Sequence, residues 1–227
     1  MRVLAIDTAL GACAAAVLDA RLGQVLASES LPMLRGHAEA IMPLIARVMD
    51  AAFIDFAILD RIAVTVGPGS FTGLRVGISA ARGIALAAGK PAIGLSTLAS
   101  LAAPYIAEDD SMTVVAAIDA RHEHVYLQAF GPAARTLVPP RIAPLREALR
   151  AAMTGPTRIV GSGADLIVAL WPKTEPPPAL VDPRGAPDID WVARLGAAAS
   201  ESQSAPKPLY LRAPDAQPQD ASQLPRR

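Results

Sequence analysis

The residues best suited to chemistry in this sequence lie in one glycine-rich turn between a strand-like run and a helix-like run. Residues 64–66 (VTV) are followed by 67–70 (GPGS), and Gly73 and Gly77 follow at four-residue spacing. Such turns often hold phosphate, because glycine lets a ligand approach the backbone and the next helix begins with unpaired N–H groups. Phosphate binding by residues 69–73 is one hypothesis for this turn, and close approach of another surface is the second.

The common phosphate-binding motifs are incomplete in this turn. A P-loop needs a lysine directly after its last glycine, but Leu74 follows Gly73. A dinucleotide-binding turn needs a carboxylate about 20 residues later to bind a ribose, and residues 61–107 contain no Asp or Glu. The same absence excludes a carboxylate general base, or a site for a hard metal ion, within this stretch.

Asp7 and Asp119 occupy equivalent positions in an internal repeat. Residues 3–9 read VLAIDTA and residues 115–121 read VAAIDAR, an offset of 112 residues that suggests a duplicated unit. A strand, a turn with an aspartate and a second strand in each half is typical of the actin, Hsp70 and sugar-kinase (ASKHA) class. The second turn (119–122, DARH) lacks the glycine that close approach of a phosphate needs. We therefore interpret both aspartates as caps of their turns.

The remaining polar residues give weak support for metal binding or hydrolysis. His122 and His124 share one strand face, but no third ligand is evident, so we expect no metal site. Ser70 lies in Gly-Pro-Gly-Ser-Phe rather than in a Gly-x-Ser-x-Gly elbow, and no His–acid pair accompanies it.

The predicted elements that must position these residues form one sheet in each half. In the first half we expect strands at 3–9, 13–20, 23–31, 61–66 and 90–96, and helices at 37–52, 72–88 and 97–107. In the second half we expect strands at 115–121, 123–130 and 158–163, and helices at 143–153, 164–170 and 188–200. The sequence thus predicts an α/β ASKHA fold of two lobes, each with a mixed sheet flanked by helices. The N-terminal lobe would be residues 1–110, the smaller C-terminal lobe 111–213, and a polar, proline-rich stretch at 214–227 a disordered tail.

Composition favours a large core and argues against direct binding of nucleic acid. The chain has 227 residues, 52% of them hydrophobic, and 21 basic and 21 acidic residues, so its net charge is zero. Proteins that hold nucleic acid usually carry a surplus of Lys and Arg. Cys13 is the single cysteine, which excludes an internal disulfide and fits a reducing compartment. With no signal-peptide pattern and no long apolar run, we expect a cytoplasmic protein without membrane contact.

Four segments together resemble the TsaB family: AIDTALGACAAAV, GPGSFTGLRVGISAARGIA, AAIDARHEHVY and PLYLRAP. The resemblance covers most of residues 1–213. It implies a non-catalytic dimerisation subunit required for threonylcarbamoyl transfer to N6 of the tRNA adenosine next to the anticodon, in tRNAs that read codons beginning with A. The alternatives are an ATP-binding kinase-like enzyme that uses the cleft between the halves, and a glycopeptidase-like hydrolase.

The resemblance also implies partners and cofactors. TsaD, a larger homologue, would perform the transfer and TsaE, an ATPase, would join the complex; tRNA would bind only through the complex, and the isolated chain could form a homodimer. The complex would use ATP, a metal ion on the partner and threonylcarbamoyl-adenylate, with no cofactor and no catalytic residue on this chain alone. Thr97 and Leu101 stand where the catalytic homologue has its metal-binding histidines, and neither can replace imidazole.

Helix 72–88 is the main candidate for the contact with that partner. Gly73, Gly77 and Ala81 share one face, which permits close helix approach, and Arg75, Ser79, Arg82 and Leu86 form a separate, mainly polar stripe. Contact of the glycine face with the partner is favoured over packing within the lobe, mainly because of the resemblance. The candidate interface residues are His37, Ile41, Gly73, Arg75, Gly77, Ser79 and Arg82. The vestigial phosphate-loop positions are Asp7, Thr8, Gly69, Ser70 and Asp119.

Overall fold

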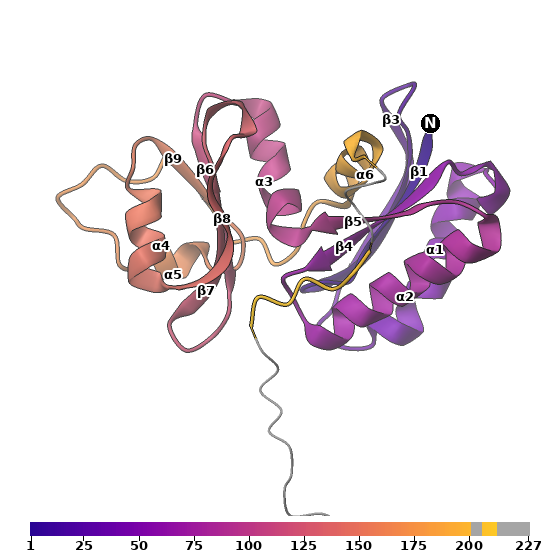
Figure 1. Cartoon of the computed structure of the whole chain (residues 1–227), viewed down its shortest axis with the longest axis horizontal. Coiled ribbons are helices and arrows are strands. Elements are labelled where there is room, and N and C mark those ends of the chain that lie inside the picture. The colour runs from indigo at the N-terminus through magenta and orange to yellow at the C-terminus, as the bar shows by residue number, and fades with distance from the viewer. Residues whose placement is uncertain (201–205, 213–227) are drawn as a thin grey trace, which may run out of the picture.

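The computed structural model describes residues 1–200 and 206–212 and contains two five-stranded sheets (Figure 1). The first half contains, in chain order, β1 (Arg2–Asp7), β2 (Ala12–Asp19), β3 (Gln24–Pro32), α1 (His37–Ala52), the 3-10 helix η1 (Phe56–Ile58), β4 (Arg61–Gly67), α2 (Phe71–Ala88), β5 (Ala92–Ser96) and α3 (Thr97–Glu108). The second half contains β6 (Thr113–Asp119), β7 (His124–Phe130), the 3-10 helix η2 (Pro132–Ala134), β8 (Thr136–Pro144), α4 (Leu145–Ala152), β9 (Thr157–Val160), α5 (Ala164–Val168), β10 (Leu180–Asp182) and α6 (Ile189–Ala198).

The two sheets have the same topology, which confirms the duplication and the ASKHA fold class. The strand order is β3-β2-β1-β4-β5 in the first sheet and β8-β7-β6-β9-β10 in the second. In each sheet the first three strands pair antiparallel and the last two join in parallel. Two strands were not predicted. β8 carries several prolines, which edge strands tolerate, and β10 has three residues.

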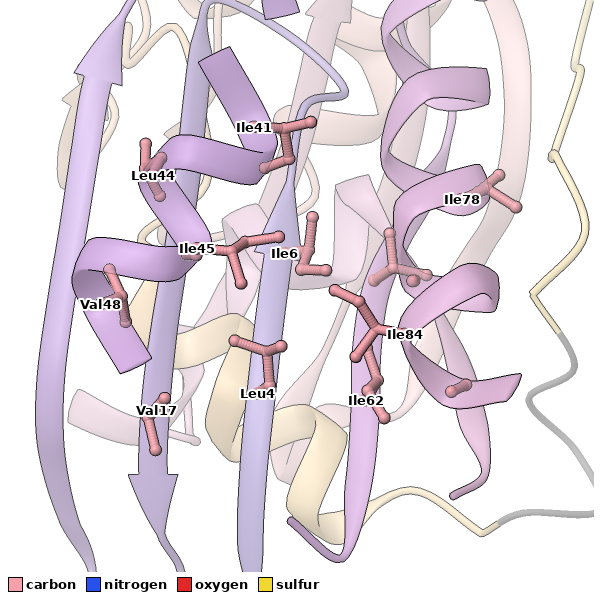
Figure 2. Close-up of a cluster of buried hydrophobic side chains, with 14 of the residues drawn as sticks. Leu4, Ile6, Val17, Ile41, Leu44, Ile45, Val48, Ile62, Ile78 and Ile84 are labelled. Atoms are coloured by element: carbon pink, nitrogen blue, oxygen red, sulfur yellow. The ribbon is translucent and has the colours of Figure 1, made fainter. Parts of the chain in front are cut away.

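The first sheet is buried on both faces because alternate residues of β1 point to opposite sides. Leu4 and Ile6 pack against α1 and α2, together with the apolar stripe of α1 that the sequence predicts (Figure 2). Val3 and Ala5 pack on the other face against α6. The side chains of β1 are fully inaccessible at these positions, so the end of this strand is held rigidly.

Helices α3 and α6 each pack against the sheet of the other half of the chain. Both lie between the two sheets (Figure 1). α3 follows β5 of the first sheet, yet its residues Leu98 and Leu101 pack in one cluster with Val114 and Ala116 of β6. α6 follows β10 of the second sheet but packs against the first. This departs from the expected boundaries, which assign α3 to the lobe at 1–110 and α6 to the lobe at 111–213.

Residues 206–212, here called the C-terminal strap, connect the two lobes. The Leu209 N–H donates to the Val66 carbonyl at 2.7 Å in the first lobe, and Arg212 Nη1 donates to the Ala120 carbonyl at 3.2 Å in the second. The segment runs between the lobes in Figure 1. The tail expected at 214–227 lies outside the described residues. None of the described helices has the length and apolar character needed to cross a membrane.

Candidate functional site

The glycines of the β4–α2 turn face the first turn of their own lobe. A Cβ on Gly69 would lie 2.3 Å from the Ala9 carbonyl oxygen, and one on Gly73 would lie 2.2 Å from the Thr8 carbonyl oxygen. A Cβ on Gly77 would lie 2.4 Å from Thr8 Oγ1. No side chain fits at these distances, so the glycines let α2 lie directly on the β1–β2 turn. The interpretation of Gly73 and Gly77 as partner contacts is therefore corrected: both are buried within the lobe.

The same packing uses the polar groups that could have held a phosphate. The Ser70 N–H donates to the Ala9 carbonyl at 2.8 Å, and the Gly73 N–H donates to Ser70 Oγ at 3.3 Å. Thr8 Oγ1 donates to the Gly73 carbonyl at 2.7 Å. Ser70 thus caps the N-terminus of α2, and the vestigial phosphate-loop positions Thr8, Gly69 and Ser70 join the turn to the helix.

Asp7 and Asp119 make equivalent turn-capping bonds in different surroundings. Asp7 Oδ1 accepts from the Ala9 N–H at 3.2 Å, and Asp119 Oδ1 accepts from the Arg121 N–H at 2.7 Å. Asp7 is fully buried and also accepts from Thr65 Oγ1, whereas Asp119 is exposed. Burial raises the pKa of Asp7 to about 6 in spite of these hydrogen bonds. Asp7 Oδ2 has no hydrogen-bond partner among the described residues.

Segments distant in the sequence contact both of these turns, one through its backbone and one through a side chain. The Gly11 N–H donates to the Gly185 carbonyl at 3.0 Å, and the strap reaches Ala120 through Arg212. Thr97 and Leu101, which the family resemblance places where the catalytic homologue has its metal-binding histidines, are fully buried. Within residues 1–200 and 206–212, no three His, Cys, Asp or Glu side chains lie together as a metal site would require.

The exposed side of α1 and α2 forms an apolar groove of about 510 Å³, here called the α1–α2 groove. Its lining residues are Ala38, Ile41, Met42, Phe71, Thr72, Arg75, Val76, Ser79 and Ala80. Met42 also lines a second hollow of about 370 Å³, together with Phe56, Ala57, Ile84, Ala87 and Ala88. Large apolar side chains stay accessible here, since Met42 is 48% exposed and Phe71 43% exposed. Such an apolar surface on a folded chain is typical of an interaction site.

The structure separates the predicted interface residues into two groups. Arg75, Ser79 and Arg82 are exposed along one stripe of α2, as the helical spacing predicts, and Ile41 lies in the floor of the groove. His37, the first residue of α1, is buried, and its Nε2 has no hydrogen-bond partner among the described residues. It therefore joins Gly73 and Gly77 in the interior rather than on the accessible surface.

Sequence reasoning missed the aromatic end of the groove. The Phe71 ring centre lies 5.3 Å from that of Tyr210 in the strap, and the Arg75 guanidinium carbon lies 3.8 Å from the Phe71 ring centre. Arg75 Nε donates to the Tyr210 hydroxyl at 3.2 Å. An aromatic residue at the first position of a helix with an arginine four residues later is a local signal. Tyr210 comes from 135 residues away and has no such signal.

Comparisons with known proteins agree on one family. Residues 24–162 match the family described as TsaD: tRNA N6-adenosine threonylcarbamoyltransferase. The tRNA threonylcarbamoyladenosine biosynthesis protein TsaB of Escherichia coli is 40% identical over 126 residues, which cover 56% of this chain and 53% of that protein. The structure of YeaZ from Pseudomonas aeruginosa superimposes with a TM-score of 0.78 and 28% identity, covering 92% of this chain and 99% of that one.

The extent of the matches differs between relatives. The matched region spans about half the length of the curated TsaB proteins of Escherichia coli and Haemophilus influenzae, 53% and 52% respectively. An uncharacterised protein of Mycobacterium tuberculosis is 31% identical over 217 residues, which cover 95% of this chain and 94% of that protein. The family match includes both helices that line the groove.

Proposed function

This chain belongs to the TsaB family, within the wider tRNA N6-adenosine threonylcarbamoyltransferase (TsaD) family, and we propose that it is a non-catalytic subunit of the threonylcarbamoyl-transferring complex. Its role is to bind a TsaD-type transferase through the α1–α2 groove. The observation that carries this proposal is the exposed apolar groove between two helices whose other sides are fully packed in the lobe.

The shape of the groove favours a helical partner surface. Two adjacent helices present a shallow apolar channel, and a second helix pair can fill it in a four-helix arrangement. A TsaD-type transferase shares the matched family region, which in this chain contains α1 and α2. Its own copies of these helices are therefore the matching surface. A second copy of this chain has the same helices, and its self-association when isolated is the competing outcome.

The absence of a catalytic role is supported by how the polar groups near the β1–β2 turn are used. Ser70 caps α2, Thr8 bonds to the helix backbone, and Asp7 is buried without contact to solvent. The transfer step, the metal ion and the threonylcarbamoyl-adenylate would then belong to the TsaD-type partner, with ATP hydrolysed by TsaE. Because the net charge is zero, tRNA would be bound through the complex.

Reconstitution with the TsaD-type transferase and TsaE of the same organism tests this function. We expect threonylcarbamoyl transfer to tRNA only when all proteins are present, and no transfer by this chain alone. Ser79→Trp places a large side chain in the groove. In a binding measurement with the same transferase, it should lower the affinity at least about tenfold, which corresponds to about 1.4 kcal/mol of binding free energy. Ser28→Trp, on exposed strand β3, is the matched control and should bind normally. Transfer by this chain alone would overturn the proposal.

A further inference from the structure

We propose that Arg75, held between Phe71 and Tyr210, is the point on the α1–α2 groove that receives a carboxylate of the docked partner. This inference rests on the proposed function and adds to it the chemistry of the partner surface. It commits the partner to an apolar helical face with an Asp or Glu at the end of the groove where α2 begins.

The contacts of Arg75 leave most of its hydrogen-bonding capacity unused. Its Nε donates to the Tyr210 hydroxyl at 3.2 Å, and its guanidinium plane lies over the Phe71 ring with 3.8 Å between the guanidinium carbon and the ring centre. Among the described residues, neither terminal nitrogen of Arg75 has a hydrogen-bond partner. Together they present the planar pair of donors that binds a carboxylate in two parallel hydrogen bonds. Among the described residues, no carboxylate lies within ion-pair distance of Arg75.

The charge around the groove indicates that this carboxylate must come from outside the lobe. Arg75 is the one charged side chain among the lining residues of the groove. Residues 61–107 contain no Asp or Glu. Glu39 lies in the first turn of α1, and its carboxylate is next to Gly36. A Cβ added to Gly36 would be 4.0 Å from Glu39 Oε2.

Docking makes the lack of a negative charge beside Arg75 energetically important. A partner that fills the groove removes water from Arg75, and a buried charge without an opposite charge beside it is strongly disfavoured. An apolar partner surface would carry that full cost, whereas a carboxylate would offset it and select one orientation of docking. The charge of Arg75 therefore favours partners with an acidic side chain at this place and disfavours uniformly apolar ones.

Tyr210 gives the site its rigidity. Phe71 and Tyr210 are 43% and 42% exposed, so both are available for contact while they fix the guanidinium. A side chain that is ordered before docking loses less entropy when its ion pair forms. The strap that carries Tyr210 is attached to Val66 in the first lobe and to Ala120 in the second. The docking surface thus includes a segment far from α1 and α2 in the sequence.

The affinity of the full chain for the purified TsaD-type transferase, measured at several NaCl concentrations, tests this assignment. We expect affinity to fall in the order wild type, Arg75→Lys, Arg75→Gln, Arg75→Glu, with at least a tenfold loss for Arg75→Gln and a weaker salt dependence. Lysine keeps the charge but loses the paired donors. Tyr210→Phe removes only the hydroxyl and should cost about threefold, within the usual range for one hydrogen bond. Arg146→Gln, at an exposed position of α4 in the second lobe, is the matched control and should bind within about twofold of wild type.

The outcomes separate this inference from the proposed function. Suppose that Ser79→Trp weakens binding, while wild type, Arg75→Gln and Arg75→Glu have equal affinity and salt dependence. The proposed carboxylate contact would then be wrong, and the groove would remain the docking surface. Normal binding by Ser79→Trp would overturn the docking surface itself. Melting temperatures of all variants show whether any loss reflects folding, and Arg75→Lys decides the case if Arg75→Gln is less stable.

Discussion

The β4–α2 and β9–α5 connections occupy equivalent positions in the two lobes and differ mainly in the length of the helix that each one enters. In the first lobe, Gly69 and Gly73 bring the turn onto the carbonyl groups of Ala9 and Thr8. In the second lobe, a Cβ on Gly161 would lie 2.4 Å from the Ala117 carbonyl oxygen, so glycine serves the same close approach. The next helix has 18 residues in the first lobe and 5 in the second.

This difference separates what the glycines after β4 and β9 do for the fold from the features that indicate a partner site. Glycine packing occurs in both lobes, so it belongs to the fold and does not by itself indicate a ligand or a partner. The long, exposed α2 occurs only in the first lobe, and it carries Arg75 and Ser79 on its accessible side. The proposed docking surface therefore lies on the side of α2 that faces away from the glycines.

The largest expected effect comes from adding one methyl group on the packed side. Gly73→Ala places a Cβ against the Thr8 carbonyl, which is backbone and cannot move without disturbing the β1–β2 turn. We expect the free energy of unfolding to fall by about 4 kcal/mol, at the upper end for overpacking. Chemical denaturation followed by circular dichroism measures this change.

Gly83→Ala is the matched control on the same helix. Gly83 is exposed, and a Cβ there meets nothing within 4 Å, so alanine should stabilise the helix by about 1 kcal/mol through its higher propensity. If Gly73→Ala were as stable as wild type, the glycine face would have room for a side chain and the structural interpretation of the motif would be wrong.

Much of the fold could be predicted because its signals are local and regular. The Ile-Asp repeat and the helical spacing of apolar residues identified the two halves, the long helices and most strands. The placement of α6 could not be predicted, because it depends on a distant contact: a Cβ on Gly196 would lie 2.3 Å from the Ala63 side chain in the first sheet. Chain order alone assigned this helix to the wrong lobe.

The candidate site shows the same limit. The exposed stripe of Arg75, Ser79 and Arg82 follows from helical periodicity and was predicted correctly as a stripe. Which face of α2 is buried in its own lobe could not be read from small-residue spacing, because the same spacing suits packing within a lobe and packing against a partner. The hydrogen bond from Arg75 to Tyr210 joins segments with no shared sequence pattern.

A pH experiment sharpens the comparison between the two aspartates of the repeat. The folded pKa of Asp7 is raised from 3.8 to about 6 by burial. The neutral form is therefore favoured by folding, and this contribution is fully present below about pH 4 and is lost as pH rises through about 6. Asp7→Asn cannot ionise, so its stability relative to wild type should increase by about 2 to 3 kcal/mol between pH 4 and pH 7, at about 1.4 kcal/mol per pKa unit.

Asp119→Asn provides the control for this experiment, because Asp119 is exposed and makes the equivalent turn hydrogen bond. Its stability relative to wild type should change by less than about 0.5 kcal/mol over the same pH range. Urea denaturation of both variants and wild type at pH 4, 5, 6 and 7 gives the difference in stability from wild type for each variant at each pH. A flat difference for Asp7→Asn would mean that Asp7 is accessible to water or paired with a cation in solution.

The smallest expected effect concerns the backbone of the β6–β7 turn. In the β6–β7 turn of the second lobe, Arg121, His122 and Glu123 have φ values of 63°, 52° and 59°, a left-handed conformation that residues with a Cβ adopt at a cost of about 1 kcal/mol each. Glu123 is exposed, and its N–H and carbonyl positions do not depend on its side chain. Glu123→Gly removes the steric cost but gives the unfolded chain more freedom, so we expect a net stabilisation of about 0.5 to 1 kcal/mol. Glu123→Ala removes the same carboxylate and keeps the Cβ, so it should show no such gain in thermal denaturation. Equal stability of the two variants would show that the carboxylate, and not the left-handed backbone, determines the energy of this turn.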